Sequence, residues 1–243
     1  MQPAPKDNSS FPASRRPIIA IDGPAGAGKS TVARHIAKYF GLLNLETGAM
    51  YRAFALKAQQ ANISLDDLVA LVGLSAKTTI HLEPGDTGNR VFLDGVDVTS
   101  QLRNATVTDA ASRVSVHPQI RVWMVRLQQE LGAAGGVVME GRDIGTVVFP
   151  HADVKIFLDA APEVRGLRRY DQMGQIGTEL AVQADEVVKE MRDRDERDRN
   201  RADSPLKPAD DAVILDSTHL TLDEVVARAE AIVTDKIHLT VQS

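Results

Sequence analysis

The chain has 243 residues, of which 43% are hydrophobic and 25% are charged, a formal net charge of -5 and no cysteine. This composition is typical of a globular protein, and the lack of cysteine excludes disulfides, cysteine–zinc sites and thiol nucleophiles. The acidic balance argues against a general binder of nucleic acid or membrane surfaces, and no apolar run approaches the roughly 18 residues needed to cross a bilayer. A cytoplasmic location is the expectation.

The first half of the chain opens with a tail and then alternates strand and helix patterns. Residues 1–16 carry proline, serine and charge without the apolar segment of a signal peptide, which predicts a flexible tail. The apolar run 18–22 predicts a strand buried on both faces, as in a parallel sheet. A glycine-rich turn and an amphipathic helix follow, and Gly41 stands where that helix would stop. A second strand is predicted at 42–46 and a second helix from about Ala49.

The middle of the chain has a different pattern. Ser64 and Asp67 resemble a capping box that opens a helix. Apolar and polar residues then alternate across 78–99, with turn signals at 84–85 and 94–95. We interpret this segment as a small antiparallel meander inserted into an otherwise alternating β/α chain.

Helical patterns resume at 104–114 and after Pro118, and a capping box at Thr221 and Glu224 precedes the last helix. Three further apolar runs are strand candidates, "VVME", "VKIFLD" and "AVILDS". About five buried strands alternating with helices predict an α/β fold, a five-stranded parallel sheet flanked by helices within one domain at 17–240.

The turn after the first strand matches G-x-x-x-x-G-K-[ST], the P-loop pattern. Its glycines let backbone N–H groups converge on phosphate oxygens, and the following helix adds its positive end. Lys29 would contact the β and γ phosphates, and the Ser30 hydroxyl would bind Mg²⁺. Asp22 either holds a water of that ion or caps the loop. The residues expected to bind ATP are Gly23, Pro24, Ala25, Gly26, Ala27, Gly28, Lys29, Ser30 and Thr31.

Arginines that follow predicted strands indicate a second anion. Arg52 comes after the second strand, and Arg142 and Asp143 come after the "VVME" run. The carboxyl ends of parallel strands meet along one crevice, where guanidinium groups clamp phosphates in pairs of hydrogen bonds. Surface ion pairs are the alternative reading. A GTPase is disfavoured because the chain contains no Asn-Lys pair of a base-reading motif.

The run "RDRDERDRNR", residues 192–201, has two readings. It fits a solvated helix with i,i+4 ion pairs. Alternatively, Arg194, Asp198 and Arg201, spaced i, i+4 and i+7, share one face that suits a ribose hydroxyl and a polar base edge.

Taken together, the motifs "IDGPAGAGKST", "ETGAMYR", "GRDIGTVVFP", "VKIFLDA", "RDRNR" and "ILDST" resemble those of bacterial cytidylate kinases, a branch of the nucleoside monophosphate kinases. They extend from Ile21 to Thr218 and so cover nearly the whole chain. The resemblance implies that the antiparallel segment at 78–99 is part of a monophosphate-binding insert at about 61–104. The chain departs from the family at Glu46, where aspartate is common, which would shift the loop that carries Thr47.

The resemblance also implies roles for individual residues. Thr47, Arg52 and Arg142 would clamp the CMP phosphate with Tyr51 packed nearby. Readers of the cytosine edge would be Ser112, Arg121, Asp143 and Arg201. Sugar contacts would come from Arg194 and Asp198.

The implied reaction is direct transfer of a phosphoryl group from ATP to CMP or dCMP by one monomer, with Mg²⁺. Lys29, Arg52 and Arg142 would be the catalytic residues, and no general base is needed because the acceptor is already anionic. We expect a lid at about 165–192, from which Arg165, Arg168 or Arg169 reaches the transferring group. The alternatives are a kinase for UMP or another small acceptor such as shikimate, and a P-loop regulatory protein.

Overall fold

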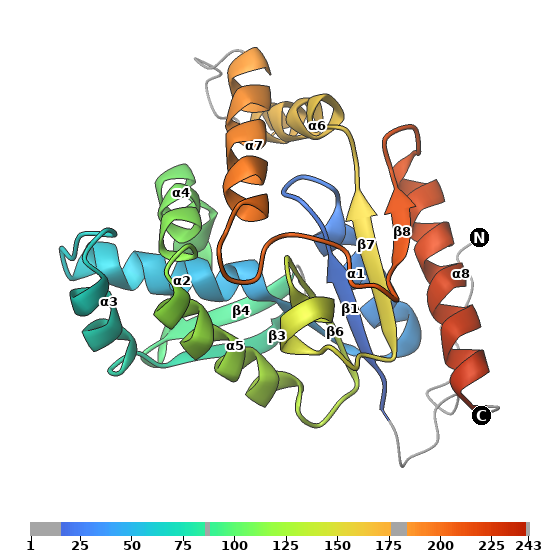
Figure 1. Cartoon of the computed structure of the whole chain (residues 1–243), viewed down its shortest axis with the longest axis horizontal. Helices are drawn as coiled ribbons and strands as arrows, with labels where there is room; N and C mark the ends of the chain where they lie inside the picture. The colour runs from blue at the N-terminus through green and yellow to red at the C-terminus, as the bar shows by residue number, and fades with distance from the viewer. Residues whose placement is uncertain (1–15, 86–87, 176–183, 242–243) are drawn as a thin grey trace. The chain divides into compact units, whose positions relative to one another are not determined.

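The computed structural model describes residues 16–85, 88–175 and 184–241 (Figure 1). The predicted tail lies outside these ranges, except for Arg16. The strands are β1 (Ile18–Asp22), β2 (Leu43–Glu46), β3 (Ile80–Gly85), β4 (Gly88–Leu93), β5 (Val96–Asp97), β6 (Val137–Gly141), β7 (Val154–Asp159) and β8 (Val213–Asp216). The helices are α1 (Lys29–Phe40), α2 (Thr47–Gln60), α3 (Leu68–Ser75), α4 (Ala105–Val114), α5 (Pro118–Gly132), α6 (Pro162–Gln175), α7 (Ala184–Arg199) and α8 (Leu222–Val241), with short helical turns η2 (Thr99–Arg103) and η3 (Ile144–Val148).

Five parallel strands form the main sheet in the order β2-β6-β1-β7-β8, which confirms the predicted α/β fold. The apolar strands β1, β6 and β7 are almost completely buried, as expected for strands covered on both faces. The prediction of burial on both faces is wrong for β2 and β8, which contain exposed positions because they are the edge strands. β2 pairs with β6 from Leu43–Val137 to Glu46–Glu140.

The chain forms two compact units, one built mainly from Ala37–Glu140 and the other from Ile19–Ile36 together with the chain from Gly141 onward. In the first unit, α2 packs on α4 and on β4 of the antiparallel sheet β3-β4-β5. Phe54 of α2 and Trp123 of α5 have ring centroids 4.9 Å apart. This unit therefore has its own apolar core beneath the meander.

The meander confirms the predicted insert. Asp94 and Gly95 both have positive φ, +49° and +81°, as a tight two-residue hairpin turn requires. The other turn signal lies at the end of the ladder, where Pro84 and Gly85 form its last two pairs with Asn89 and Gly88. The connecting residues 86–87 lie outside the described ranges.

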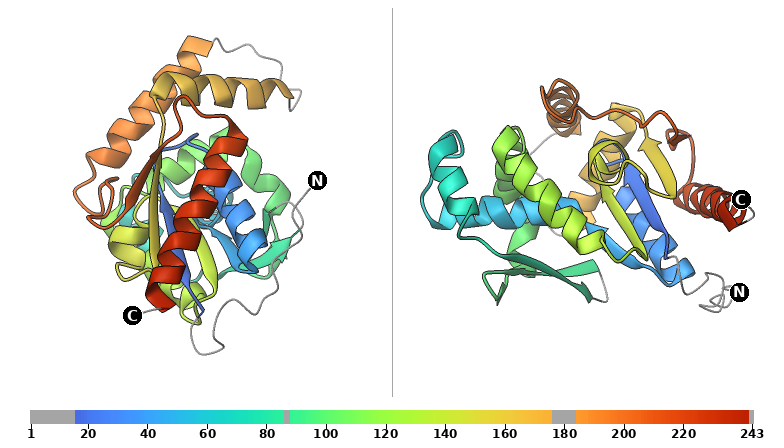
Figure 2. Two further views of the ribbon diagram at one scale, coloured as in Figure 1. Left: turned by 90° about the vertical axis from the view of Figure 1, so that its right-hand side faces the viewer. Right: turned by 60° about the horizontal axis from the view of Figure 1, so that its bottom comes forward.

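In the second unit, β1, β7 and β8 are neighbours, and α8 lies against β7 and β8 (Figure 2). The capping box before α8 is confirmed, because Thr221 and Glu224 exchange hydrogen bonds through their backbone N–H groups and side chains. Helices α6 and α7 pack on each other. Gly166 permits their close approach, since a Cβ at this position would lie 2.3 Å from Cγ2 of Val188.

Two helix boundaries differ from the predictions. Helix α3 is capped by Asp67, whose Oδ1 accepts from the Ala70 N–H, and not by Ser64, whose hydroxyl accepts from Asp66. Helix α7 ends at Arg199, so Arg201 lies beyond it. Within the described part of the chain, no helix is long and apolar enough to cross a membrane. The single domain 17–240 stays a prediction.

Candidate active site

The P-loop between β1 and α1 needs glycine for steric reasons. Gly23, Gly26 and Gly28 have φ of +147°, +75° and +96°, conformations that residues with a Cβ rarely adopt. A Cβ at Gly23 would also lie 1.9 Å from the Leu158 carbonyl oxygen of β7. The first glycine therefore lets the loop leave β1 directly beside the neighbouring strand.

Lys29 begins α1 at the end of this loop. Its side chain is buried, and its Nζ donates to the Pro24 carbonyl at 2.7 Å. The chain thus curls around the lysine, and the partly exposed Ser30 lies next to it in the first helical turn. A loop of this form, with a cation inside and a helix N-terminus behind it, is suited to a phosphate chain.

Asp22, the last residue of β1, joins the P-loop to a second loop of the same unit. Its Oδ1 and Oδ2 accept from the backbone N–H groups of Ile144 and Gly145 at 2.8 and 2.7 Å. Burial raises the pKa of Asp22 to about 7, with Asp143 adding to the rise and the two N–H groups and Lys29 opposing it. Its carboxyl group therefore fixes the turn that follows Arg142 and Asp143.

Arg142 leaves β6 within this second loop. Its Nε donates to Asp198 Oδ2 at 2.9 Å, and its Nη1 donates to the Gly141 carbonyl at 3.2 Å. The Arg142 side chain is 19% exposed, whereas that of Asp198 is 7% exposed. The structure thus brings together two residues that lie 56 positions apart and were predicted separately.

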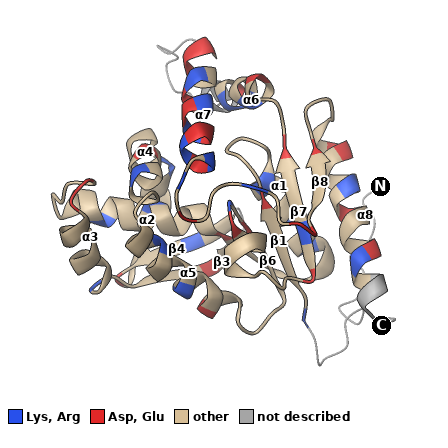
Figure 3. Cartoon of the chain, viewed as in Figure 1, with Lys and Arg blue, Asp and Glu red and all other residues tan. Residues whose placement is uncertain are grey.

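Asp198 lies among three arginines. Its burial would raise its pKa, but Arg142, Arg201 and Arg194 outweigh burial and hold the pKa below the usual range. Arg201 Nη2 lies 3.5 Å from Asp198 Oδ1, and its Nε donates to the Asp198 carbonyl. The shared face therefore exists although the helix ends at Arg199. Acidic and basic residues alternate along the rest of α7 (Figure 3).

Two of the arginines predicted to belong to a lid, Arg165 and Arg168, have different surroundings. Arg165 on α6 is fully buried, and it donates to the carbonyls of Ala160 and Ala25 and to both carboxylate oxygens of Asp195 on α7. Arg168 donates to the hydroxyl and carbonyl of Ser217 after β8. Arg165 therefore ties helices α6 and α7 to the P-loop.

The contact between α7 and the P-loop is close. A Cβ on Gly26 would lie 3.1 Å from Cε of Met191 and 3.3 Å from Cβ of Arg165. Sequence reasoning missed Asp195, the partner of Arg165. The signal was present, because Val187, Met191, Asp195 and Asp198 recur at intervals of three or four residues, and they form the buried stripe of α7.

In the other unit, the predicted acceptor residues cluster at the start of α2. The Thr47 hydroxyl donates to the Glu140 carbonyl at 2.8 Å, and Arg52 Nη2 lies 2.5 Å from Glu46 Oε1. Tyr51 is partly buried next to Arg52. A Cβ on Gly48 would lie 3.2 Å from Nη1 of Arg52, so the guanidinium lies against the first turn of the helix. Glu46 was noted in the sequence only as a departure from the family, not as the partner of Arg52.

Ser112 on α4 and Arg121 on α5 lie in the same unit as α2. Arg121 is 3% exposed and its Nη1 donates to the Ser115 carbonyl, while the Ser115 hydroxyl donates to the Ser112 carbonyl. The Ser112 hydroxyl is buried and has no hydrogen-bond partner among the described residues. A buried hydroxyl of this kind is costly unless a ligand or water satisfies it.

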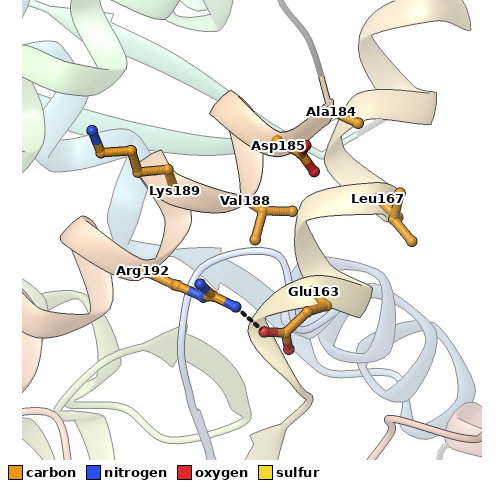
Figure 4. A pocket seen from close by; sticks show the side chains of 7 residues that line it. All are labelled: Glu163, Leu167, Ala184, Asp185, Val188, Lys189 and Arg192. Atoms are coloured by element: carbon orange, nitrogen blue, oxygen red, sulfur yellow. Dashed lines mark hydrogen bonds and ion pairs between the residues drawn. The ribbon is translucent and has the colours of Figure 1, made fainter.

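A hollow of ≈ 320 Å³ lies between α6 and α7 and is lined by Glu163, Leu167, Ala184, Asp185, Val188, Lys189 and Arg192 (Figure 4). Arg192 pairs with Glu163 across it. None of the predicted nucleotide-binding residues lines this hollow. Among the described residues no cluster of three or more His, Cys, Asp or Glu could hold a metal.

Comparison with known proteins identifies the family. The family model for cytidylate kinase matches residues 19–235. A cytidylate kinase of Pasteurella multocida is 44% identical over 216 residues, which is 89% of this chain and 94% of the relative. One of Pelotomaculum thermopropionicum is 49% identical over 211 residues, 86% of this chain and 92% of the relative. A solved shikimate kinase from Acinetobacter baumannii aligns over 96% of this chain and 98% of its own, with 15% identity and a TM-score of 0.48. The chain belongs to the cytidylate kinase family.

Proposed function

We propose that the protein transfers the γ-phosphoryl group of ATP to CMP and dCMP, giving CDP and dCDP. The observation that carries this proposal is a second cationic cluster in the same unit as the P-loop. Arg142, Arg194 and Arg201 surround the buried Asp198 there, while Lys29 lies inside the P-loop. A P-loop that only bound or hydrolysed ATP would not need such a cluster.

On the donor side, the P-loop N–H groups and Lys29 hold the triphosphate. The residues fit Mg²⁺ bound with a nucleotide, because Ser30 offers a hydroxyl oxygen in the first turn of α1 and Mg²⁺ keeps most of its other ligands as water and phosphate. When bound, the ion neutralises charge on the β and γ phosphates. Asp22 holds the adjoining loop through its two backbone hydrogen bonds.

On the acceptor side, Thr47, Arg52 and Arg142 hold the phosphate of CMP. The guanidinium of Arg142 is engaged through Nε with Asp198, which holds it in a fixed direction, and a guanidinium has five N–H donors in all. The phosphate oxygen that attacks is already negative, so no residue has to remove a proton. Catalysis then consists of alignment and charge neutralisation.

Recognition of cytosine falls to Ser112, Arg121, Asp143 and Arg201, and the sugar is held by Arg194 and Asp198. The buried Ser112 hydroxyl, without a partner among the described residues, supports this assignment because a polar ligand atom would satisfy it. A site of this kind rejects the wrong base by about 10⁴-fold or more, since a mismatched edge leaves buried polar groups unpaired.

Of the three lid arginines, Arg169 is assigned to the transferring phosphoryl group. The guanidinium groups of Arg165 and Arg168 are engaged with protein atoms, whereas Arg169 is partly exposed and its side chain makes no hydrogen bond to another residue in the described ranges. Arginines in this role raise rates by about 10³–10⁵. The protein is proposed to act as a monomer in the cytoplasm.

The test is a comparison of acceptors. Purified protein is mixed with ATP and Mg²⁺ and with CMP, dCMP, UMP, AMP or shikimate in turn, and kcat/KM is measured for each. CMP and dCMP should be phosphorylated far better than AMP. A comparable kcat/KM for AMP would refute the base assignment, and ATP hydrolysis without transfer to any acceptor would favour the regulatory alternative.

A further inference from the structure

We propose that Asn89, in strand β4 of the meander, is a positioning residue for the acceptor clamp. Its side chain hydrogen-bonds to the end of β2, and Glu46, the last residue of β2, pairs with Arg52. The inference rests on the proposed function, in which Arg52 binds the acceptor phosphate. The meander would then help to position the acceptor phosphate through Asn89, a residue that no sequence motif indicated.

The amide group of Asn89 makes two hydrogen bonds to one stretch of backbone. Its Oδ1 accepts from the Glu46 N–H at 2.9 Å, and its Nδ2 donates to the Asn44 carbonyl at 2.8 Å. In an extended strand, the carbonyl of one residue and the N–H of the second residue after it point to the same side. β2 is an edge strand that pairs with β6 on its other side. Asn89 therefore covers the open edge of β2 as a neighbouring strand would.

The fixed stretch of backbone leads directly to the arginine. Glu46 is extended, with φ -94° and ψ 97°, and immediately precedes α2. Its N–H is held by Asn89, and the hydroxyl of the next residue, Thr47, is held by the Glu140 carbonyl. The Glu46 carboxylate then meets Arg52 Nη2 at 2.5 Å. The direction of the Arg52 guanidinium is thus set by a side chain whose backbone is anchored on both sides.

This ion pair is open to an incoming anion. The side chains of Arg52 and Glu46 are 22% and 27% exposed. A guanidinium has five N–H donors, so a phosphate can bind the arginine while Glu46 keeps hold of one edge. Displacement of Arg52 by even about 1 Å can cost 10²-fold in rate when the group aligns a reacting partner.

The meander itself is held in place by other contacts. Val91 and Leu93 of β4 are 2% and 4% exposed, and β4 packs on α2. Pairing of β3 with β4 runs over six residue pairs, from Ile80–Leu93 to Gly85–Gly88. Removing the Asn89 amide therefore cuts the link to β2 while the core beneath the meander stays intact.

The neighbouring residue provides a matched control. Arg90 follows Asn89 on the same strand, its side chain is 51% exposed, and it pairs with Asp97 and Glu83 within the meander. Its guanidinium carbon lies 4.8 Å from the centre of the Phe92 ring. Arg90→Ala thus alters the meander surface and leaves β2 alone.

The experiment measures kcat and KM for CMP and for ATP, together with thermal unfolding, in Asn89→Ala and Arg90→Ala. We expect Asn89→Ala to lower kcat/KM for CMP by about 10- to 100-fold, with KM for ATP within about twofold, whereas Arg90→Ala leaves all constants within about twofold. Asn89→Leu, which keeps a similar shape, serves as a second variant if the alanine protein is too unstable. A wild-type kcat/KM for CMP in either Asn89 variant overturns the inference.

A double-mutant cycle tests the route through Glu46. If Asn89 acts on Arg52 through Glu46, Asn89→Ala combined with Glu46→Gln should lose little more than the larger of the two single losses. Losses that multiply would contradict this route. If the wild-type protein makes no CDP, the proposed function fails by itself. The link to β2 is then judged by hydrogen exchange of the Glu46 amide, which should accelerate in Asn89→Ala relative to Arg90→Ala; an unchanged rate overturns it.

Discussion

Replacing Arg165 with methionine tests how helices α6 and α7 are attached to the P-loop. Arg165 is fully buried and its guanidinium donates to Asp195, whose side chain is 8% exposed, and to the Ala25 carbonyl of the P-loop at 2.9 Å. In Arg165→Met, Asp195 becomes a buried carboxylate without its counter-ion. Breaking a buried pair in this way costs about 3–5 kcal/mol of unfolding free energy.

For a chain of this size each kcal/mol corresponds to about 2–4 °C in melting temperature, so Arg165→Met should melt roughly 6–20 °C lower. The double variant Arg165→Met, Asp195→Leu removes both charges and should regain most of that loss, because apolar residues of similar volume often replace buried pairs at no net cost. The Ala25 carbonyl would still lack its donor. KM for ATP should therefore be higher than that of the wild type in both variants, although the double variant has regained its stability.

Thermal unfolding and steady-state kinetics together separate the two effects. The control is Arg192→Ala, which removes an ion pair to Glu163 between the same two helices, with side chains 57% and 55% exposed. It should lower stability by less than about 1 kcal/mol. A melting temperature of Arg165→Met close to that of the control, or a double variant less stable than the single one, would refute the reasoning.

Three further predictions concern the P-loop and Asp22, the residue that precedes it. Lys29→Ala should abolish transfer while CMP binding, followed by calorimetry, stays largely intact; loss of both would mean that the site is arranged differently. Gly23→Ala should cost at least about 2 kcal/mol in urea unfolding, because the new Cβ would lie 1.9 Å from the Leu158 carbonyl at a φ of +147°, and wild-type stability would rule out this geometry. Burial raises the pKa of Asp22 to about 7. Between about pH 4 and 7 the folded protein therefore keeps a proton on Asp22 that the unfolded chain has released. Because of this difference, the contribution of Asp22 to the free energy of unfolding falls as pH rises. The stability of wild type relative to Asp22→Asn should therefore fall from about pH 4.5 to about pH 7.5, and a constant difference would contradict this.

The parallel sheet, the P-loop and the meander could be predicted because each depends on local signals. Apolar runs specify buried strands, and glycine, proline and aspartate specify turns. The predictions were wrong where burial or a helix boundary depends on contacts with residues distant in the sequence. Burial of β2 and β8 depends on their position at the sheet edges, and the end of α7 at Arg199 is not marked by a glycine or proline in the sequence.

The candidate site shows the same division. Spacing in the run 192–201 indicated that Arg194 and Asp198 share a face, because helical geometry is local. Arg201 joins Asp198 from just beyond the end of α7. The periodic pattern of α7 marked Asp195 as a buried position, but its pairing with Arg165 could not be predicted. The same holds for the pairings of Arg165 with Ala25 and of Glu46 with Asn89, which are 140 and 43 positions apart and form only after folding. Pairings at such separations leave no periodic signal in a single sequence.

The stereochemistry of transfer tests the central claim most directly, that the phosphoryl group passes in one step between two nucleotides and no residue carries it in between. ATP made chiral at the γ-phosphorus with sulfur and oxygen isotopes is used to phosphorylate CMP, and the configuration of the CDP product is determined. One in-line displacement predicts inversion. Retention would indicate two displacements through a phosphorylated residue and would contradict the account.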